Sequence, residues 1–116
     1  MLIYKILTNS EWEEAKQLEY YEGSVLDRKD GFIHLSSREQ LAETLAIHFK
    51  NQLGLRVLSY STEDMEELKW ESSRGGQLFP HLYARLPMKA YQSVCILEVN
   101  AEGIPLPPWE TAETKL

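Results

Sequence analysis

The chain lacks several features that would restrict its function at once. Its 116 residues include a single cysteine, Cys95, so no disulfide can form within the chain and nothing requires an oxidising compartment. Lysine and arginine number 12 against 18 acidic residues, which gives a net charge of −6, and the basic residues form no cluster. Because nucleic acids are bound through clustered Lys and Arg, we expect no nucleic-acid partner.

Long apolar runs are missing as well. No stretch approaches the ~20 apolar residues of a membrane-spanning helix. The opening segment, MLIYKILTNSEWEE, lacks the basic start and long apolar stretch of a signal peptide. We therefore expect a cytoplasmic protein with no membrane partner.

Short motifs with a known mechanism are also absent. The sequence contains no Gly-x-Gly-x-x-Gly, no phosphate-binding loop, no Cys-x-x-Cys and no His-Glu-x-x-His. Two histidines and a carboxylate could ligate zinc or iron, but the three histidines lie far apart in the sequence, without the spacing of a metal-ligand motif. We expect no metal site.

What the sequence does contain is a mixture of strand and helix patterns. Apolar or alternating stretches typical of strands occur at residues 2–7, 32–35, 55–61, 81–86 and 91–100. Strands and helices do not alternate strictly, which disfavours a doubly wound parallel sheet. We predict one α+β domain over residues 1–108, with a mainly antiparallel sheet, whole or split, two main helices, and a tail at 109–116.

Capping patterns place the two helices. Ser10 with Glu13 predicts the start of the first, and Ser37 with Gln40 the start of the second. The apolar stripe of the second runs to Leu53 and stops at Gly54. Residues 62–70 resemble a further short helix, 21–31 a turn-rich segment, and 71–80 a loop containing two adjacent glycines.

The stretch GFIHLSS, residues 31–37, contains the first candidate site residue. His34 alternates with Ile33 and Leu35, so it faces the other side of the strand, which ends directly before a helix start. A helix N-terminus offers free N–H groups and a partial positive charge that suit an anion. The alternative is a core histidine with both ring nitrogens satisfied.

A second candidate row lies in FPHLYARL. His81, Tyr83 and Arg85 share one strand face by the period of two, whereas the residues between them are apolar. The alternative is a solvated strand face. We expect His34 and His81 to line one cleft and to be replaceable by apolar residues at little cost to stability.

Two neighbours and one further histidine complete the candidates. Glu71 is either a general base or a surface carboxylate, and Trp70 is a core or pocket-wall residue. His48 lies late on the second helix, where a histidine interacts favourably with the helix dipole.

Together these segments resemble a known family. YKIL, Trp12, DGFIHLS with Gln40, KWE and FPHLY, in this order, are similar to the small bacterial proteins of the domain of unknown function 952, over residues 2–108. Ala84 stands where the family pattern has glycine. The family carries no established activity.

The arrangement also resembles the ADP-ribosyltransferase-like fold, and in particular the N-terminal half of RNA 2′-phosphotransferases. In those enzymes one strand ends in Tyr-His-Gly-Thr and another in His-Leu-Ser. Tyr4 matches the Tyr, with Lys5 next to it where the family has His, and His34-Leu35-Ser36 match the second motif.

The resemblance implies catalytic roles for His34, His81, Tyr83 and Glu71, and ligand contacts from Tyr4, Lys5, Ser36, Trp70 and Arg85. The expected function is an enzyme acting on NAD, ADP-ribose or a phosphorylated nucleotide or ribose, with NAD as the candidate cofactor. The alternatives are a non-catalytic small-ligand binding or sensor module and, third, a domain that only binds other proteins.

Overall fold

The computed structural model describes residues 1–110 of the chain. Its helices are α1 (Asn9–Ala15), α2 (Val25–Asp30) and α3 (Arg38–His48), with 3₁₀ turns at Thr62–Asp64 and Arg74–Gly76. Its strands are β1 (Leu2–Leu7), β2 (Tyr20–Tyr21), β3 (Ile33–His34), β4 (Ser36–Ser37), β5 (Arg56–Ser61), β6 (Leu68–Ser72), β7 (Leu78–Leu82), β8 (Leu86–Pro87) and β9 (Ser93–Ile96).

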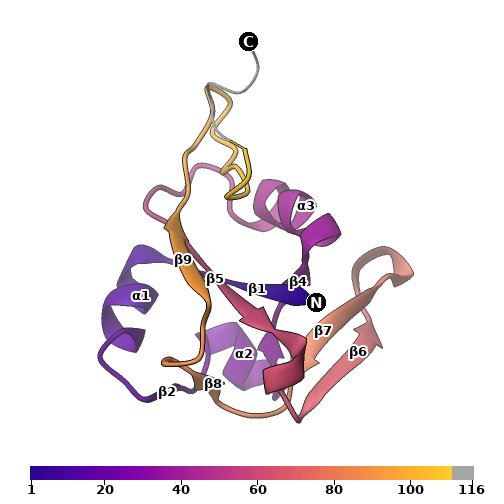
Figure 1. Ribbon diagram of the computed structural model, residues 1–116. Coiled ribbons are helices and arrows are strands. Elements are labelled where there is room, and N and C mark those ends of the chain that lie inside the picture. Colours follow the sequence, from indigo (N-terminus) through magenta and orange to yellow (C-terminus); the bar gives the residue numbers. More distant parts are fainter. Residues whose placement is uncertain (111–116) are drawn as a thin grey trace.

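The strands form three antiparallel sheets. The largest has the order β4-β1-β5-β9, the second β3-β7-β6, and the third pairs β2 with β8. Figure 1 shows the β6–β7 hairpin standing beside the central sheet, with α3 on one side of it and α1 and α2 on the other. The predicted α+β class and antiparallel pairing are confirmed, with the sheet split.

One short segment joins the two larger sheets. Ile33 and His34 pair with Leu82 and His81 in the second sheet, whereas the next strand, β4, pairs with β1 in the first. Between them the N–H of Leu35 donates to the carbonyl of Pro80 at 3.1 Å. The stretch quoted above as GFIHLSS is therefore the crossing point between the sheets.

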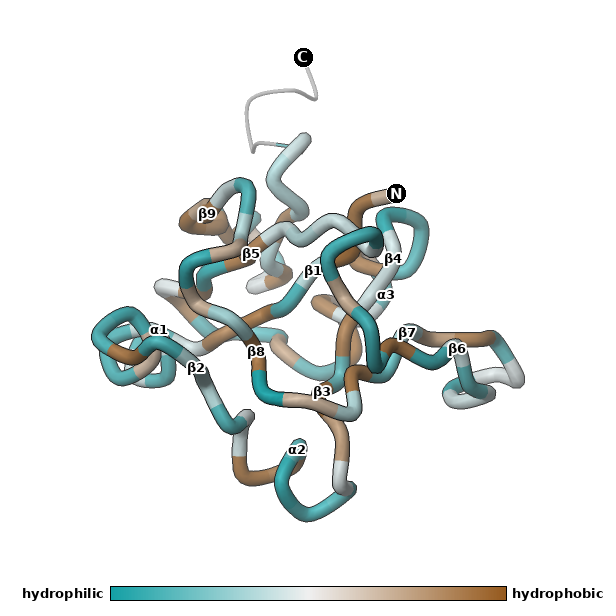
Figure 2. The backbone as a smooth tube through the Cα atoms, turned by 60° about the horizontal axis from the view of Figure 1, so that its bottom comes forward, coloured by the Kyte–Doolittle hydropathy of each residue, from teal (hydrophilic) through white to brown (hydrophobic). Residues whose placement is uncertain are grey.

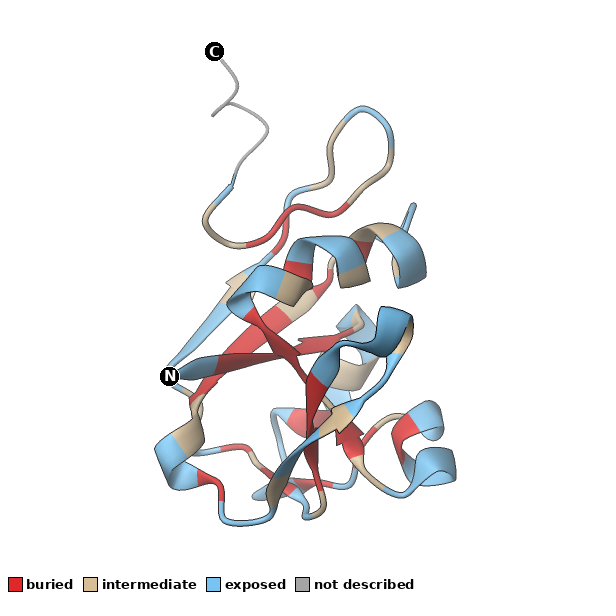
Figure 3. Ribbon diagram, turned by 90° about the vertical axis from the view of Figure 1, so that its right-hand side faces the viewer, coloured by how far each residue is buried: buried red, intermediate tan, exposed pale blue. Residues whose placement is uncertain are grey.

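Apolar side chains pack on both faces of the central sheet. One cluster holds Ile3, Leu7, Leu58 and Tyr60 with residues from β3, β7 and β8, and the other packs β1 and β5 against α3. Figure 3 shows these central strands in red beneath α3, and Figure 2 shows α1 and α2, each with both hydrophilic and hydrophobic residues, at the periphery. The strand at residues 55–61 is thus buried on both faces, not half-buried, because it lies between β1 and β9.

Both main helices differ from their predicted bounds. α1 starts two residues early, because Thr8 and Glu11 form the capping box in place of Ser10 and Glu13. α3 begins at Arg38 with the Ser37 N–H on Gln40, as predicted, but it ends at His48. Asn51 adopts a left-handed backbone (φ 67°) and donates its N–H to Gly103, so Leu53 lies outside the helix, 78% exposed.

The prediction of a helix at 62–70 and a loop at 71–80 was wrong for much of both segments. A 3₁₀ turn at Thr62–Asp64 precedes the β6–β7 hairpin, which begins at Leu68 and contains a second 3₁₀ turn at Arg74–Gly76. Gly75 and Gly76 both have positive φ at its tip, which glycine adopts without steric cost. The strand predicted at 81–86 is divided between β7 and β8, and the one at 91–100 is limited to β9.

The beginning of the predicted tail packs on the domain. Trp109 lies edge-on to Tyr4 with 5.5 Å between ring centroids, and the guanidinium of Arg38 lies 3.9 Å from the centre of the Trp109 ring. The rest of the predicted tail, residues 111–116, is outside the described residues. Within residues 1–110, no helix combines the length and apolarity that crossing a membrane requires.

Candidate functional site

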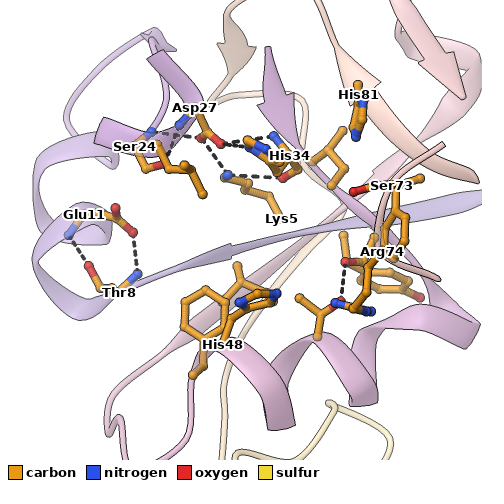
Figure 4. Close-up of a pocket in the computed structure, with 18 of the residues that line it drawn as sticks. Lys5, Thr8, Glu11, Ser24, Asp27, His34, His48, Ser73, Arg74 and His81 are labelled. Atoms are coloured by element: carbon orange, nitrogen blue, oxygen red, sulfur yellow. Dashed lines mark hydrogen bonds and ion pairs between the residues drawn. The ribbon is translucent and has the colours of Figure 1, made fainter. Parts of the chain in front are cut away.

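A cavity of about 500 Å³ opens between the central sheet, the β6–β7 hairpin and α3, with parts of α1 and α2 along one side. Figure 4 shows its labelled side chains converging from these elements. The titratable groups that line it are Lys5, Glu11, Asp27, His34, His48, Arg74, His81 and the phenol of Tyr4. Its volume lies within the range of small-molecule sites.

A buried ion pair forms one wall of the cavity. Lys5 Nζ, on β1, lies 2.7 Å from Asp27 Oδ2, on α2, with side-chain exposures of 5% and 2%. Lys5 also donates to the His34 carbonyl at 3.2 Å, and the Ser24 N–H donates to Asp27 Oδ2 at 2.9 Å. Burial alone would raise the pKa of Asp27, but the hydrogen bond from His34 and the charge of Lys5 outweigh it and hold the pKa well below its usual range.

His34 lies between two carboxylates. Its Nδ1 is 2.6 Å from Asp27 Oδ1 and its Nε2 is 3.0 Å from Asp30 Oδ2. The backbone N–H of His34 donates to Asp27 Oδ1 as well, at 3.1 Å. An ionised carboxylate only accepts hydrogen bonds, so Nδ1 is the donor toward Asp27. Nε2 lies at ion-pair distance from Asp30, and both of these side chains are partly exposed.

His81 is the direct cross-strand neighbour of His34, with 5.8 Å between the ring centroids. Its Nδ1 lies 2.9 Å from Glu71 Oε1, and Tyr83 donates its hydroxyl to the same oxygen at 2.6 Å. Hydrogen bonds from Tyr83 and His81 lower the pKa of Glu71, and the hydrogen bond to Glu71 raises the pKa of Tyr83.

The second nitrogen of His81 is available to the cavity. Its Nε2 makes no hydrogen bond within residues 1–110, and no buried side-chain polar atom there lacks a partner, so Nε2 is accessible. His81 itself is 5% exposed and lines the cavity. Phe32 stacks on the imidazole at 4.0 Å between centroids and holds its plane. With Nδ1 hydrogen-bonded to Glu71, Nε2 is the ring nitrogen left to contact a ligand.

The structure brings together most of the residues that the sequence suggested. Tyr4, Lys5, His34, Ser36 and His81 line the cavity, and Glu71 and Tyr83 are hydrogen-bonded to one another behind His81.

Two suggested residues lie elsewhere. Arg85 follows the end of β7 in the turn before β8, so it does not continue the face of His81. Its guanidinium lies 4.3 Å from the Tyr20 ring centre and lines a second depression of about 330 Å³, which Tyr83 also lines. Trp70 is 38% exposed and lines neither depression.

The cavity also uses the helix differently from the sequence interpretation. α3 contributes Thr44 and His48 from its middle and last turn, not its N-terminus, and no residue from 37 to 43 lines the cavity. Among residues 1–110, no three His, Cys, Asp or Glu side chains are grouped so that they could hold a metal ion.

Asp27 and Arg74 are among the lining residues that the sequence interpretation missed. Asp27 was assigned to a turn, although Ser24 three residues earlier is a capping partner and Gly31 ends the helix in a left-handed conformation. That spacing was the available signal. Arg74 was assigned to a loop, and its contact with Thr44, 30 residues away, has no counterpart in local sequence.

Comparison with known proteins identifies the family. Protein CC0527 from Caulobacter crescentus has a crystal structure that superimposes with a TM-score of 0.88 at 47% identity, covering 91% of this chain and 94% of that one. A crystal structure of a double mutant of CC0527 gives 0.87 at 48% identity over the same shares. The solution structure gives 0.81 at 48% identity, covering 90% of each chain.

Neither the fold comparison nor the sequence comparison supplies an activity. No match was found among curated proteins. The family model described as "Protein of unknown function (DUF952)" matches residues 6–94, which include the paired histidines and the carboxylates bound to them. The chain therefore belongs to the DUF952 family.

Proposed function

We propose that this protein is an enzyme acting on a small phosphorylated ribose or nucleotide, a class that includes NAD and ADP-ribose. The observation that carries the proposal is the pair of cross-strand histidines in one cavity, each with Nδ1 on a carboxylate. Carboxylate-oriented imidazoles are a recurrent arrangement for proton transfer.

The two histidines would have opposite roles. His81 offers Nε2 as the acceptor of a proton from an attacking water or hydroxyl, with Glu71 fixing its tautomer. His34, oriented by Asp27 through Nδ1, would supply a proton to the leaving group from Nε2 once the ligand replaces the partly exposed Asp30 carboxylate there. The rings are close enough, at 5.8 Å between centroids, to act on one bound group.

We extend the proposal to a likeness with the ADP-ribosyltransferase-like fold. Its support is the split antiparallel sheet, with the His-Leu-Ser sequence at the point where two sheets meet and Tyr4 on the adjacent strand lining the same cavity.

A second candidate is a binding or sensor module that uses the same cavity without turnover. The observation that favours it is the saturation of His34: both of its ring nitrogens are held by Asp27 and Asp30, which leaves one histidine with an accessible nitrogen.

The test is an incubation of the purified protein with NAD, ADP-ribose and a 2′-phosphorylated ribonucleotide, with released nicotinamide and phosphate measured. We expect turnover by the wild type and by the control Tyr20→Phe, which alters a side chain outside the cavity. His81→Asn should retain binding and lose turnover. Binding without any turnover favours the sensor module, and the absence of all binding contradicts both readings.

A further inference from the structure

The permanent charges of the cavity are unevenly compensated. Lys5 is paired with buried Asp27 at 2.7 Å, so its charge is already neutralised. Arg74 lies in the turn of the β6–β7 hairpin and lines the same cavity. Among residues 1–110, its only carboxylate contact is Glu43 Oε1, which lies 3.3 Å from Nε, and Glu43 is 57% exposed. The guanidinium therefore has donors to spare and a weak, solvent-screened partner.

Hydroxyl groups gather around this guanidinium. Arg74 donates from a terminal nitrogen to Thr44 Oγ1 at 3.1 Å, and Ser36 Oγ lies 3.5 Å from the same oxygen. Ser73, the neighbour of Arg74, lines the cavity too. These side chains come from β4, α3 and the hairpin, so three separate elements bring hydrogen-bond donors to one place. One guanidinium with several hydroxyls matches the oxygens of a phosphate monoester.

The side of the cavity opposite Arg74 carries the carboxylate of Glu11, whereas the charge of Asp27 on that side is balanced by Lys5. Figure 4 shows Glu11 and Asp27 on the side away from Arg74 and Ser73. Glu11 accepts the Thr8 N–H through one carboxylate oxygen, and its side chain lines the cavity. A ligand with one phosphate thus meets unlike charges at its two ends.

We propose that Arg74, with Ser36, Thr44 and Ser73, forms a phosphate-monoester subsite at the hairpin end of the cavity. This inference rests on the proposed function and fixes the orientation of its ligand: the phosphate at Arg74, the remainder toward the Lys5–Asp27 wall. Without a bound phosphate, the Glu43 carboxylate contacts the Arg74 guanidinium, and the phosphate displaces this carboxylate when it binds.

The experiment compares ligand pairs that differ by one phosphate, AMP with adenosine and ribose 5-phosphate with ribose, by isothermal titration calorimetry. For the wild type we expect tighter binding of the phosphorylated member. Arg74→Gln should weaken the binding of the phosphorylated compound tenfold to hundredfold, the range of a charge-assisted hydrogen bond. It should leave the binding of the unphosphorylated compound unchanged. Glu43→Gln should strengthen the binding of the phosphorylated compound, because the competing carboxylate is removed.

The matched control is Arg38→Gln, which removes an arginine that stacks on Trp109 outside the cavity. This variant should bind all four compounds as the wild type does. If the phosphorylated compounds bind Arg74→Gln as they bind the wild type, the subsite is wrong while the proposed function stands. If none of the four compounds binds the wild type, the proposed function fails together with the subsite. Circular dichroism of each variant verifies that it is folded.

Discussion

Asp27→Asn is the substitution that the structure predicts to be most damaging for its size. The change keeps the side-chain shape and leaves an amide oxygen for the Ser24 N–H. It removes the charge that faces Lys5 Nζ at 2.7 Å, with the lysine side chain 5% exposed. Breaking a buried ion pair from one side costs ~3–5 kcal/mol, against a total of ~5–15 kcal/mol for a domain. We expect a loss of that order in the free energy of unfolding.

Urea unfolding followed by tryptophan fluorescence measures this loss. Asp30→Asn is the matched control, because Asp30 is 36% exposed and exposed pairs contribute ~0–1 kcal/mol. Adding Lys5→Met to Asp27→Asn should recover most of the loss, since the stranded charge is then gone. A loss below about 1 kcal/mol for Asp27→Asn would refute the buried pair.

The same pair makes stability depend on pH. The folded pKa of Asp27 lies below its ordinary value of 3.8, so the pair stabilises the fold above that value and the contribution is lost as pH falls below it. The difference between wild type and Asp27→Asn should therefore shrink in acid, below about pH 4. A difference that stays constant down to pH 2 would contradict the assignment.

The remaining predictions concern the two histidines and their partners. His34→Leu should cost ~1–3 kcal/mol in urea unfolding because it strands buried Asp27, whereas His81→Leu should cost less because Glu71 is 40% exposed; equal losses would contradict this difference. Glu71→Gln should lower the pKa of Tyr83 toward its ordinary value of 10.0, because the hydrogen bond to the carboxylate is lost, and ¹³C NMR titration of the Tyr83 ring measures it. An unchanged Tyr83 titration would show that the two groups are not in contact in solution.

The structure also changes one expectation drawn from the sequence. Both histidines were expected to be replaceable without loss, as cleft residues often are. That expectation stays with His81. For His34 the expectation no longer holds, because Asp27 is 2% exposed and its Oδ1 would lose the hydrogen bond of the His34 ring.

Local patterns predicted the parts of the site that lie on regular strands. The period of two placed His34 opposite to Ile33, and His81 opposite to Leu82: both histidines line the cavity, and Ile33 and Leu82 pack in the core. Strand β1 was predicted with its observed bounds, and Lys5 lies on it. What local pattern could not supply was the partner of each group, because Lys5 and Asp27 are 22 residues apart.

Longer-range packing decided the rest. α3 stops before Leu53 because Asn51 is bound to Gly103, more than 50 residues along the chain, which overrides the apolar stripe. The row His81-Tyr83-Arg85 would share a face on a continuous strand, but β7 ends at Leu82. Arg85 consequently leaves the cavity, and Arg74 reaches it from the hairpin turn.

The crossing at Leu35 has a consequence for how the domain unfolds. Residues on either side of it belong to different sheets, and its own N–H is bound to Pro80 in the second. β3 and β4 are two-residue edge strands of different sheets, and only Leu35 separates them. If one of them leaves its sheet, it therefore pulls on the other. We therefore expect the two sheets to unfold together as one cooperative unit.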